Sequence, residues 1–138
     1  MRSLNEKSIY RIIDANFNRS KEGLRVCEDI CRFVLNDQNA TAQWKILRHR
    51  LTKVIEGLKI TEMIEARRVH EDVGRQSMRL EFKRKNMTDI FYANCQRVKE
   101  SLRVLEELLK LMRKKLAEEL KHMRYQVYAL EQKIIRKL

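Results

Sequence analysis

Two asparagine–arginine pairs are the residues of this sequence whose types and spacing best suit the binding of an anion. Asn16 is followed by Arg19, and Asn94 is followed by Arg97. A guanidinium group is planar and always charged, so it can hold a phosphate through two parallel hydrogen bonds. A spacing of three residues places both members of a pair on one side of a helix. The four residues are therefore candidates for an anion site to which both pairs contribute.

Both pairs lie in an internal repeat. The segment 14–29, DANFNRSKEGLRVCED, aligns with the segment 92–107, YANCQRVKESLRVLEE, at an offset of 78 residues. A weaker similarity follows in each half, where Lys45-x-x-Arg48-His49 resembles Lys121-x-x-Arg124-Tyr125. Self-similarity at a fixed offset indicates that one structural unit has been duplicated.

Helical periodicity predicts that the repeated Asn and Arg side chains face inward. With 3.6 residues per turn, Asn16 falls in the middle of the apolar stripe and Arg19 on its flank, about 60° away. The same holds for Asn94 and Arg97. Burying an unpaired charge costs several kcal/mol, so each inward arginine needs an anionic partner. Two alternatives are open: an internal salt bridge, or a polar cavity between the helices that receives an anionic ligand.

Further candidate residues come from other segments. Arg67 and Asp72 belong to the charged segment 67–85, which we interpret either as a solvated connector or as a lid that closes over a substrate. Arg48 and His49 are candidate supplements from the second helix. The predicted site therefore comprises eight residues: Asn16, Arg19, Arg48, His49, Arg67, Asp72, Asn94 and Arg97.

Apolar residues at helical spacing define the elements that must position these side chains. The sequence has no proline and three glycines, which argues against a turn-rich β fold. We expect four long helices: 6–36, 41–66 with Thr41 as its N-cap, a helix from 86 or 88 to about 113, and a last helix to 138. A loop, 67–85, joins the second helix to the third. Within the loop, alternating Met78, Leu80 and Phe82 are compatible with a short extended piece.

The expected fold is all-α, an antiparallel four-helix bundle built from two duplicated hairpins with pseudo-twofold symmetry. Two like hairpins bury their apolar stripes best against each other. The repeat halves are 6–66 and 86–138, and at this length the prior is a single domain, 1–138.

Composition narrows the classes of partner. The 138 residues carry 31 basic and 19 acidic side chains, a net charge of +12. Such a field attracts nucleic acid, membrane headgroups or phosphorylated small molecules. No apolar run is long enough for a membrane helix or a secretory signal. Three cysteines (Cys27, Cys31 and Cys95) imply no disulfide framework, so a cytoplasmic location is expected and the cysteines are read as small core residues rather than metal ligands.

Five stretches together resemble a known family: IYRIIDANFNRSKEGLRVCEDICRFVL, KILRHRL, ARRVHEDVGR, ANCQRVKESLRVLEE and MRYQVYALE. They resemble the small helical domain that is often fused to thiamine-phosphate synthase and acts as a hydroxymethylpyrimidine-phosphate kinase. The resemblance covers about Ile9 to Ile134, and the paired AN-x-x-R and LRV-x-E motifs are specific. The domain is expected here to stand alone. The chain differs from the family pattern at Arg68 and Arg75.

The resemblance implies ATP-dependent phosphoryl transfer onto hydroxymethylpyrimidine phosphate, with ATP and Mg²⁺ required. Phosphate oxygens would be neutralised by Arg19, Arg48, Arg67 and Arg97. The pyrimidine or the phosphates would be held by Asn16 and Asn94, and Mg²⁺ would be contacted by Asp72, Glu22 and Glu100. Functional association with thiamine-phosphate synthase is expected as well, and no catalytic base is assigned.

Two other functions stay open. One is an arginine-lined helical enzyme of the chorismate-mutase kind that acts on a small anionic metabolite. The other is a basic nucleic-acid-binding bundle, which is disfavoured because the nine aromatic residues are not interleaved with basic clusters. Inward-facing Arg19 and Arg97 would favour a small ligand, and outward-facing ones a polymer. A homodimer is compatible with the sequence.

Overall fold

The regular secondary structure in the described part of the chain is entirely helical, as predicted. The computed structural model describes residues 2–76 and 83–138, with side chains from residue 5 onward. In these residues the elements are helix α1 (Arg2–Asp29), the π-helical turn η1 (Ile30–Val34), α2 (Gln38–Glu56), α3 (Ile60–Glu65), the 3₁₀ turn η2 (Val69–Glu71), α4 (Met87–Leu109) and α5 (Lys114–Ile135). The alternating residues Met78, Leu80 and Phe82 of the predicted loop lie outside the described residues.

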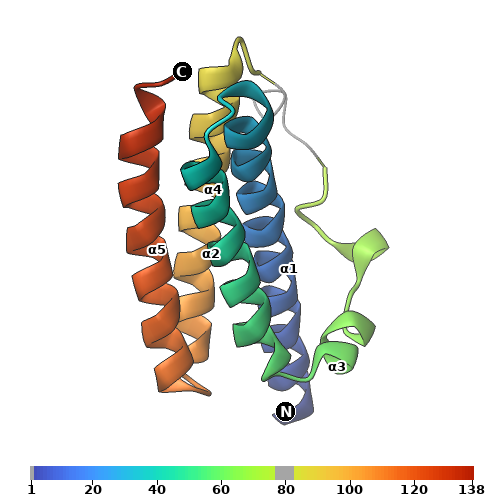
Figure 1. Cartoon of the computed structure of the whole chain (residues 1–138). Helices are drawn as coiled ribbons and strands as arrows, with labels where there is room; N and C mark the ends of the chain where they lie inside the picture. The colour runs from blue at the N-terminus through green and yellow to red at the C-terminus, as the bar shows by residue number, and fades with distance from the viewer. Residues whose placement is uncertain (1, 77–82) are drawn as a thin grey trace.

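The four long helices α1, α2, α4 and α5 lie side by side (Figure 1). The colours show that α1 and α5 run in one direction and α2 and α4 in the other. The most extensive packing is between α1 and α4 and between α4 and α5, followed by α1 and α2, while α2 meets α5 along a narrower strip. At the centre, the rings of Trp44 and Phe91 meet edge to face with centroids 6.0 Å apart. The shared core therefore joins the first half of the chain to the second.

The predicted helix 41–66 begins too late and is interrupted in its middle, whereas its predicted end agrees with the end of α3 at Glu65. The side chain of Asp37, rather than Thr41, caps α2 by accepting a hydrogen bond from Ala40 N at 2.9 Å. The helix then ends at Gly57, and a separate short helix, α3, begins at Ile60. Glycine is a poor helix former, and the change of direction allows Met63 to be buried against the core, where it is 1% exposed. After this break α3 packs against α1 and does not continue in line with α2.

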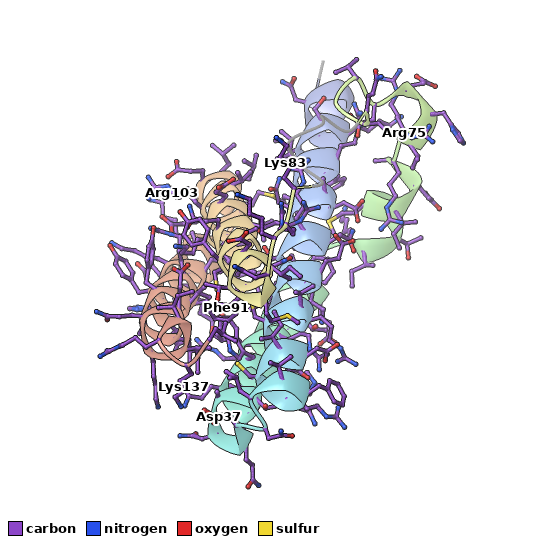
Figure 2. All side chains as sticks on the ribbon, turned by 90° about the horizontal axis from the view of Figure 1, so that it is seen from above. Asp37, Arg75, Lys83, Phe91, Arg103 and Lys137 are labelled. Atoms are coloured by element: carbon purple, nitrogen blue, oxygen red, sulfur yellow. The ribbon has the colours of Figure 1, made fainter. Side chains whose placement is uncertain are left out.

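Other helix boundaries follow local signals. Asn86 caps α4 by accepting a hydrogen bond from Asp89 N at 2.9 Å, as its position before the third predicted helix suggested. The first predicted helix, 6–36, ends instead in the π turn, and Asn36 adopts a left-handed conformation with φ 50°. Asparagine tolerates this conformation better than most residues. The chain then reverses into α2, and Asp37 lies beside Lys137 at the same end of the molecule (Figure 2).

Small residues let α1 and α4 approach closely at a seam. The hydroxyls of Ser20 and Ser101 are 2.6 Å apart across it. A Cβ added to Gly23 would lie 2.6 Å from Val98 Cγ2 and 3.1 Å from the carbonyl oxygen of Asn94. Only a residue without a side chain fits at Gly23, so the seam holds no space for a buried guanidinium.

In the described part of the chain, no helix is both long enough and apolar enough to cross a bilayer.

Candidate functional site

A cleft of about 640 Å³ lies between α1 and the segment that follows α3. The lining residues from α1 recur mostly every three or four residues, so they form one face of that helix. The opposite wall comes from the segment around η2, and Val104 of α4 contributes to the floor. The lining residues are Ser8, Arg11, Ile12, Asp14, Ala15, Asn16, Arg19, Arg67, Arg68, Val69, Asp72 and Val104. Four of the eight predicted site residues, namely Asn16, Arg19, Arg67 and Asp72, thus meet in one place.

Asp14 fixes Arg67 at the wall of the cleft. Arg67 Nε donates to Asp14 Oδ2 at 2.6 Å, and its Nη2 donates to Oδ1 at 2.9 Å. The carboxylate is largely buried, whereas the Arg67 side chain is 42% exposed. These hydrogen bonds raise the pKa of Arg67 above its ordinary value. Arg67 therefore presents a positioned guanidinium whose charge is largely balanced by Asp14.

The other cleft arginines differ in their partners. Arg68 pairs with Glu71 in an exposed ion pair. Among the described residues, Arg11 and Arg19 have no carboxylate oxygen within 4.0 Å. Arg19 Nη1 donates to Asn16 Oδ1 at 3.4 Å, and Asn16 Nδ2 in turn donates to the carbonyl of Ile12 at 2.9 Å. The α1 wall therefore carries two positive charges that are available to an anion.

The prediction that Arg19 and Arg97 face inward is wrong. Both residues are exposed, and Arg97 Nη2 instead lies 3.6 Å from Glu22 Oε1 on the surface. Because α1 and α4 approach closely, a long arginine side chain is accommodated more easily with its guanidinium group in solvent than between the helices. The asparagines behave as predicted in part: Asn16 is buried and Asn94 half-buried.

The structure does not bring Asn94 and Arg97 into this cleft, nor Arg48 and His49. Asn94 Nδ2 donates to the carbonyl of Ile90 at 2.8 Å, as Asn16 does to its own helix. Arg48 Nε donates to Glu28 Oε1 at 2.9 Å, and its guanidinium fills the contact between α1 and α2. His49 is exposed on α2.

A buried carboxylate explains Arg48 better than a ligand does. The Glu28 side chain is 3% exposed and needs a cation. The same arrangement recurs in the second half, where Arg124 Nη2 lies 3.5 Å from Glu106 Oε1. Glu28 and Glu106 are equivalent in the repeat, so this paired signal was present in the sequence.

Arg11 and Asp14 are cleft residues that sequence reasoning missed. Arg11 precedes Arg19 by eight residues and so shares its helix face. The repeat concealed it, because the position equivalent to Arg11 is Asp89. Helical spacing measured backward from Arg19 would have found it.

The cleft offers limited ligation to a metal ion. No group of three His, Cys, Asp or Glu side chains in the described ranges is arranged to hold one. A magnesium ion that is bound mainly through substrate phosphates needs only one or two protein carboxylates. Asp72 could supply one; its Oδ1 accepts a hydrogen bond from Gly74 N at 3.0 Å. The residues therefore fit Mg²⁺ that arrives with a phosphorylated substrate.

The sequence model of the ThiD2 family matches residues 11–133, which include the cleft from Arg11 to Val104. The chain belongs to the ThiD2 family. Similar proteins include the thiamine-phosphate synthases of Nostoc punctiforme, with 40% identity over 94% of this chain and 36% of that protein, and of Thermosynechococcus vestitus, with 42% identity over 88% of this chain and 34% of that protein. The synthase of Rhodopirellula baltica is 34% identical over 94% of this chain and 35% of its own length.

This ThiD2 chain thus spans about one third of the length of the curated relatives it matches. Their name shows that the family occurs in proteins of thiamine biosynthesis. No solved structure matches the chain.

Proposed function

We propose that this ThiD2 chain is a kinase that transfers a phosphoryl group from ATP to hydroxymethylpyrimidine phosphate and gives the diphosphate. The observation that carries the proposal is the cleft in which Arg11, Arg19, Arg67 and Arg68 surround a space of about 640 Å³. Phosphoryl transfer needs little covalent chemistry from the protein and depends mainly on positioning and charge neutralisation. A cleft rich in guanidinium groups supplies both. Family membership supports the pathway in which this activity belongs.

The residues have distinct roles in this proposal. Arg19 and Arg11 bind phosphate oxygens, because neither is neutralised by a carboxylate in the described part of the chain. Arg67 binds from the opposite wall, where Asp14 orients it. Asn16 orients Arg19 through its amide oxygen. Mg²⁺ would neutralise charge on the phosphates when bound, with Asp72 as its protein ligand.

Several finer expectations belong to the same proposal. ATP and Mg²⁺ are its substrate and cofactor, and the acceptor is a small phosphorylated pyrimidine. A cytoplasmic location fits the three free cysteines. Functional association with thiamine-phosphate synthase is supported by the relatives, whose longer chains contain a segment like this one.

We also interpret the four long helices as an antiparallel bundle formed by duplication around a pseudo-twofold axis at the α1–α4 seam. The offset of 78 residues makes Ser20 equivalent to Val98 and Gly23 equivalent to Ser101. The contact of Ser20 with Ser101 is therefore equivalent to the contact of Val98 with Gly23. The same register relates Glu28 to Glu106, and the similarity between the second helices of the two halves, at an offset of 76 residues, relates Arg48 to Arg124, so the two ion pairs are equivalent. Equivalent residues thus make equivalent contacts in both halves.

Release of ADP from ATP, Mg²⁺ and hydroxymethylpyrimidine phosphate tests the proposed activity. We expect Arg19→Gln to lower kcat/KM by about tenfold or more, since a charge-assisted hydrogen bond contributes about 1.5–3 kcal/mol. Arg50→Gln is the matched control, because Arg50 hydrogen-bonds Gln126 between α2 and α5 and does not line the cleft. Absence of turnover by pure, folded wild-type protein would contradict the proposal, and turnover of a metabolite without nucleotide would favour the mutase alternative.

One observation favours nucleic-acid binding as a second candidate function. Arg19 and Arg97 are exposed, and Tyr92, Tyr125 and Tyr128 line a groove of about 640 Å³ over α4 and α5. Exposed aromatic rings beside cations can stack on single-stranded bases. This function predicts binding of an oligonucleotide whose affinity falls steeply with salt and falls further in Tyr125→Ala. Unchanged affinity in that variant would argue against it.

A further inference from the structure

A row of alternating charges crosses the α1–α4 seam next to the cleft. Arg19 and Glu22 are neighbours on one face of α1, because they are three residues apart. Arg97 of α4 reaches Glu22 at 3.6 Å. The two arginines that are equivalent in the repeat therefore flank a single carboxylate, with Arg19 on the cleft side.

The surface around Arg97 repeats the floor of the cleft. Ala15 and Val104 line the cleft, and the repeat register relates them to Ala93 and Val26. All four residues are half-buried. Each of the two surfaces thus combines an asparagine, an arginine and an alanine from one half of the chain with a valine from the other half.

The two halves differ in charge. In the first half, Arg11, Arg67 and Arg68 lie in the cleft together with Asn16 and Arg19. In the second half, the position of Arg11 is held by Asp89, and Arg97 faces Glu22. The first half therefore suits the more highly charged of two anionic ligands.

We propose that the duplicated halves form two adjacent phosphate subsites, with the nucleotide triphosphate bound by the first half and the monophosphate acceptor bound by Asn94 and Arg97. This inference rests on the proposed kinase function and assigns its two substrates to the two copies. An acceptor phosphate oxygen forms the new bond to the γ-phosphorus, and the bond from that phosphorus to the β–γ bridging oxygen breaks. The electron pair of that bond leaves with ADP, so that atoms and charge balance without a further reactant. Arg19 and Arg97 lie on either side of the transferred group.

Calorimetric binding of each ligand alone tests the proposal without turnover. The probes are a non-hydrolysable ATP analogue with Mg²⁺ and hydroxymethylpyrimidine phosphate. We expect Arg19→Gln to lower the affinity for the ATP analogue by about tenfold or more. Arg97→Gln should lower the affinity for the monophosphate by a similar factor. Each variant should leave the other ligand within about twofold of wild type, and Arg50→Gln should leave both unchanged.

Glu22→Gln supplies an independent measurement. The substitution removes the carboxylate charge that pairs with Arg97. This exposed ion pair is weak by itself. We expect monophosphate binding to strengthen up to about threefold, whereas binding of the analogue changes less. A loss of monophosphate affinity in this variant would overturn the assignment of Arg97.

The outcomes separate this inference from the proposed function. If wild type binds both ligands and releases ADP, but Arg97→Gln keeps wild-type affinities, the second subsite is wrong and the kinase stands. The same conclusion follows if both arginine variants weaken the same ligand. If folded wild type binds neither probe, the proposed function fails, and the two-subsite inference fails with it.

Discussion

At the scale of single residues, the length of a polar side chain decided whether it is buried. Asn16 lies in the middle of the apolar stripe of α1 and Arg19 on its flank, and only Asn16 is buried. The short amide of Asn16 donates a hydrogen bond to the carbonyl of Ile12 in its own helix. Its burial therefore leaves the amide group with a partner. The long arginine side chain can lie along the seam with its charge in water.

We expect Asp14→Asn to lower the free energy of unfolding by about 1 kcal/mol, measured by urea denaturation. The variant loses a charged, bidentate partner of Arg67, but Arg67 is 42% exposed, so solvent screens the pair. Asp72→Asn, at an exposed position without an ion pair in the described residues, should stay within about 0.5 kcal/mol of wild type. Equal stability of the two variants would show that Asp14 does not anchor Arg67.

The cysteines should be unreactive while the protein is folded. Burial raises the pKa of Cys31 to about 11, and Cys27 and Cys95 are buried with their sulfurs 3.7 Å apart. At pH 8 only about one Cys31 in a thousand is a thiolate. We expect mass spectrometry after iodoacetamide treatment at pH 8 to show no labelling in buffer and three labelled cysteines in denaturant. Rapid labelling of the native protein would contradict the burial of these thiols.

At the scale of elements, the α1–α4 seam holds the two halves in register. Gly23 and the serine pair Ser20–Ser101 allow the two backbones to approach closely at this point. The cleft depends on this seam, since one of its floor residues comes from α4 and one wall is a face of α1. A change at the seam should therefore alter both stability and the cleft.

Gly23→Ala should lower the free energy of unfolding by about 1–3 kcal/mol, because the new Cβ would lie 3.1 Å from the Asn94 carbonyl oxygen, a backbone atom. Gly57→Ala is the matched control. Its nearest neighbour would be the Val54 carbonyl oxygen at 3.5 Å, so we expect it to be neutral or slightly stabilising. Chemical denaturation of both variants measures the difference. A Gly23 variant as stable as the control would show that the seam can open freely.

At the scale of the whole molecule, an ion pair joins the ends of distant elements. Lys137 Nζ lies 2.7 Å from Asp37 Oδ2 (Figure 2). The hydrogen bond from Ala40 N, and then Lys137, lower the pKa of Asp37. Asp37 thus caps α2 and also links the turn before it to the C-terminal end of the described chain.

The lowered pKa of Asp37 predicts an acid-dependent loss of stability. A carboxylate whose pKa is lower in the folded state stabilises the fold above its ordinary pKa, and this contribution disappears as pH falls through the lowered value. Asp37→Asn keeps a capping side chain but removes the charge. We expect its Tm to lie below that of wild type at pH 7 and to converge with it near pH 2. Glu119→Gln, at an exposed position on α5, should show no such convergence; a constant gap for Asp37→Asn would contradict the assignment.

Much of the local structure was predictable from the sequence. Helical spacing predicted an all-helical chain, Asn86 marked the start of α4, and Asn16 was correctly placed in the core. These features depend on neighbours within about one helical turn, so short-range patterns contain them. The interruption at Gly57 was missed, because the apolar spacing continues across it and the gain from burying Met63 depends on α1.

The candidate site was only half predictable, for a physical reason. Sequence by itself determined the residue types, the helix faces and the duplicated register. Only the tertiary structure decided which faces meet: Asp14 with Arg67, Glu28 with Arg48, and Glu22 with Arg97. Each pair joins two different elements, and its formation depends on how whole helices pack. A helical period specifies the direction of a side chain from its own axis, but the partner in that direction is set by long-range packing.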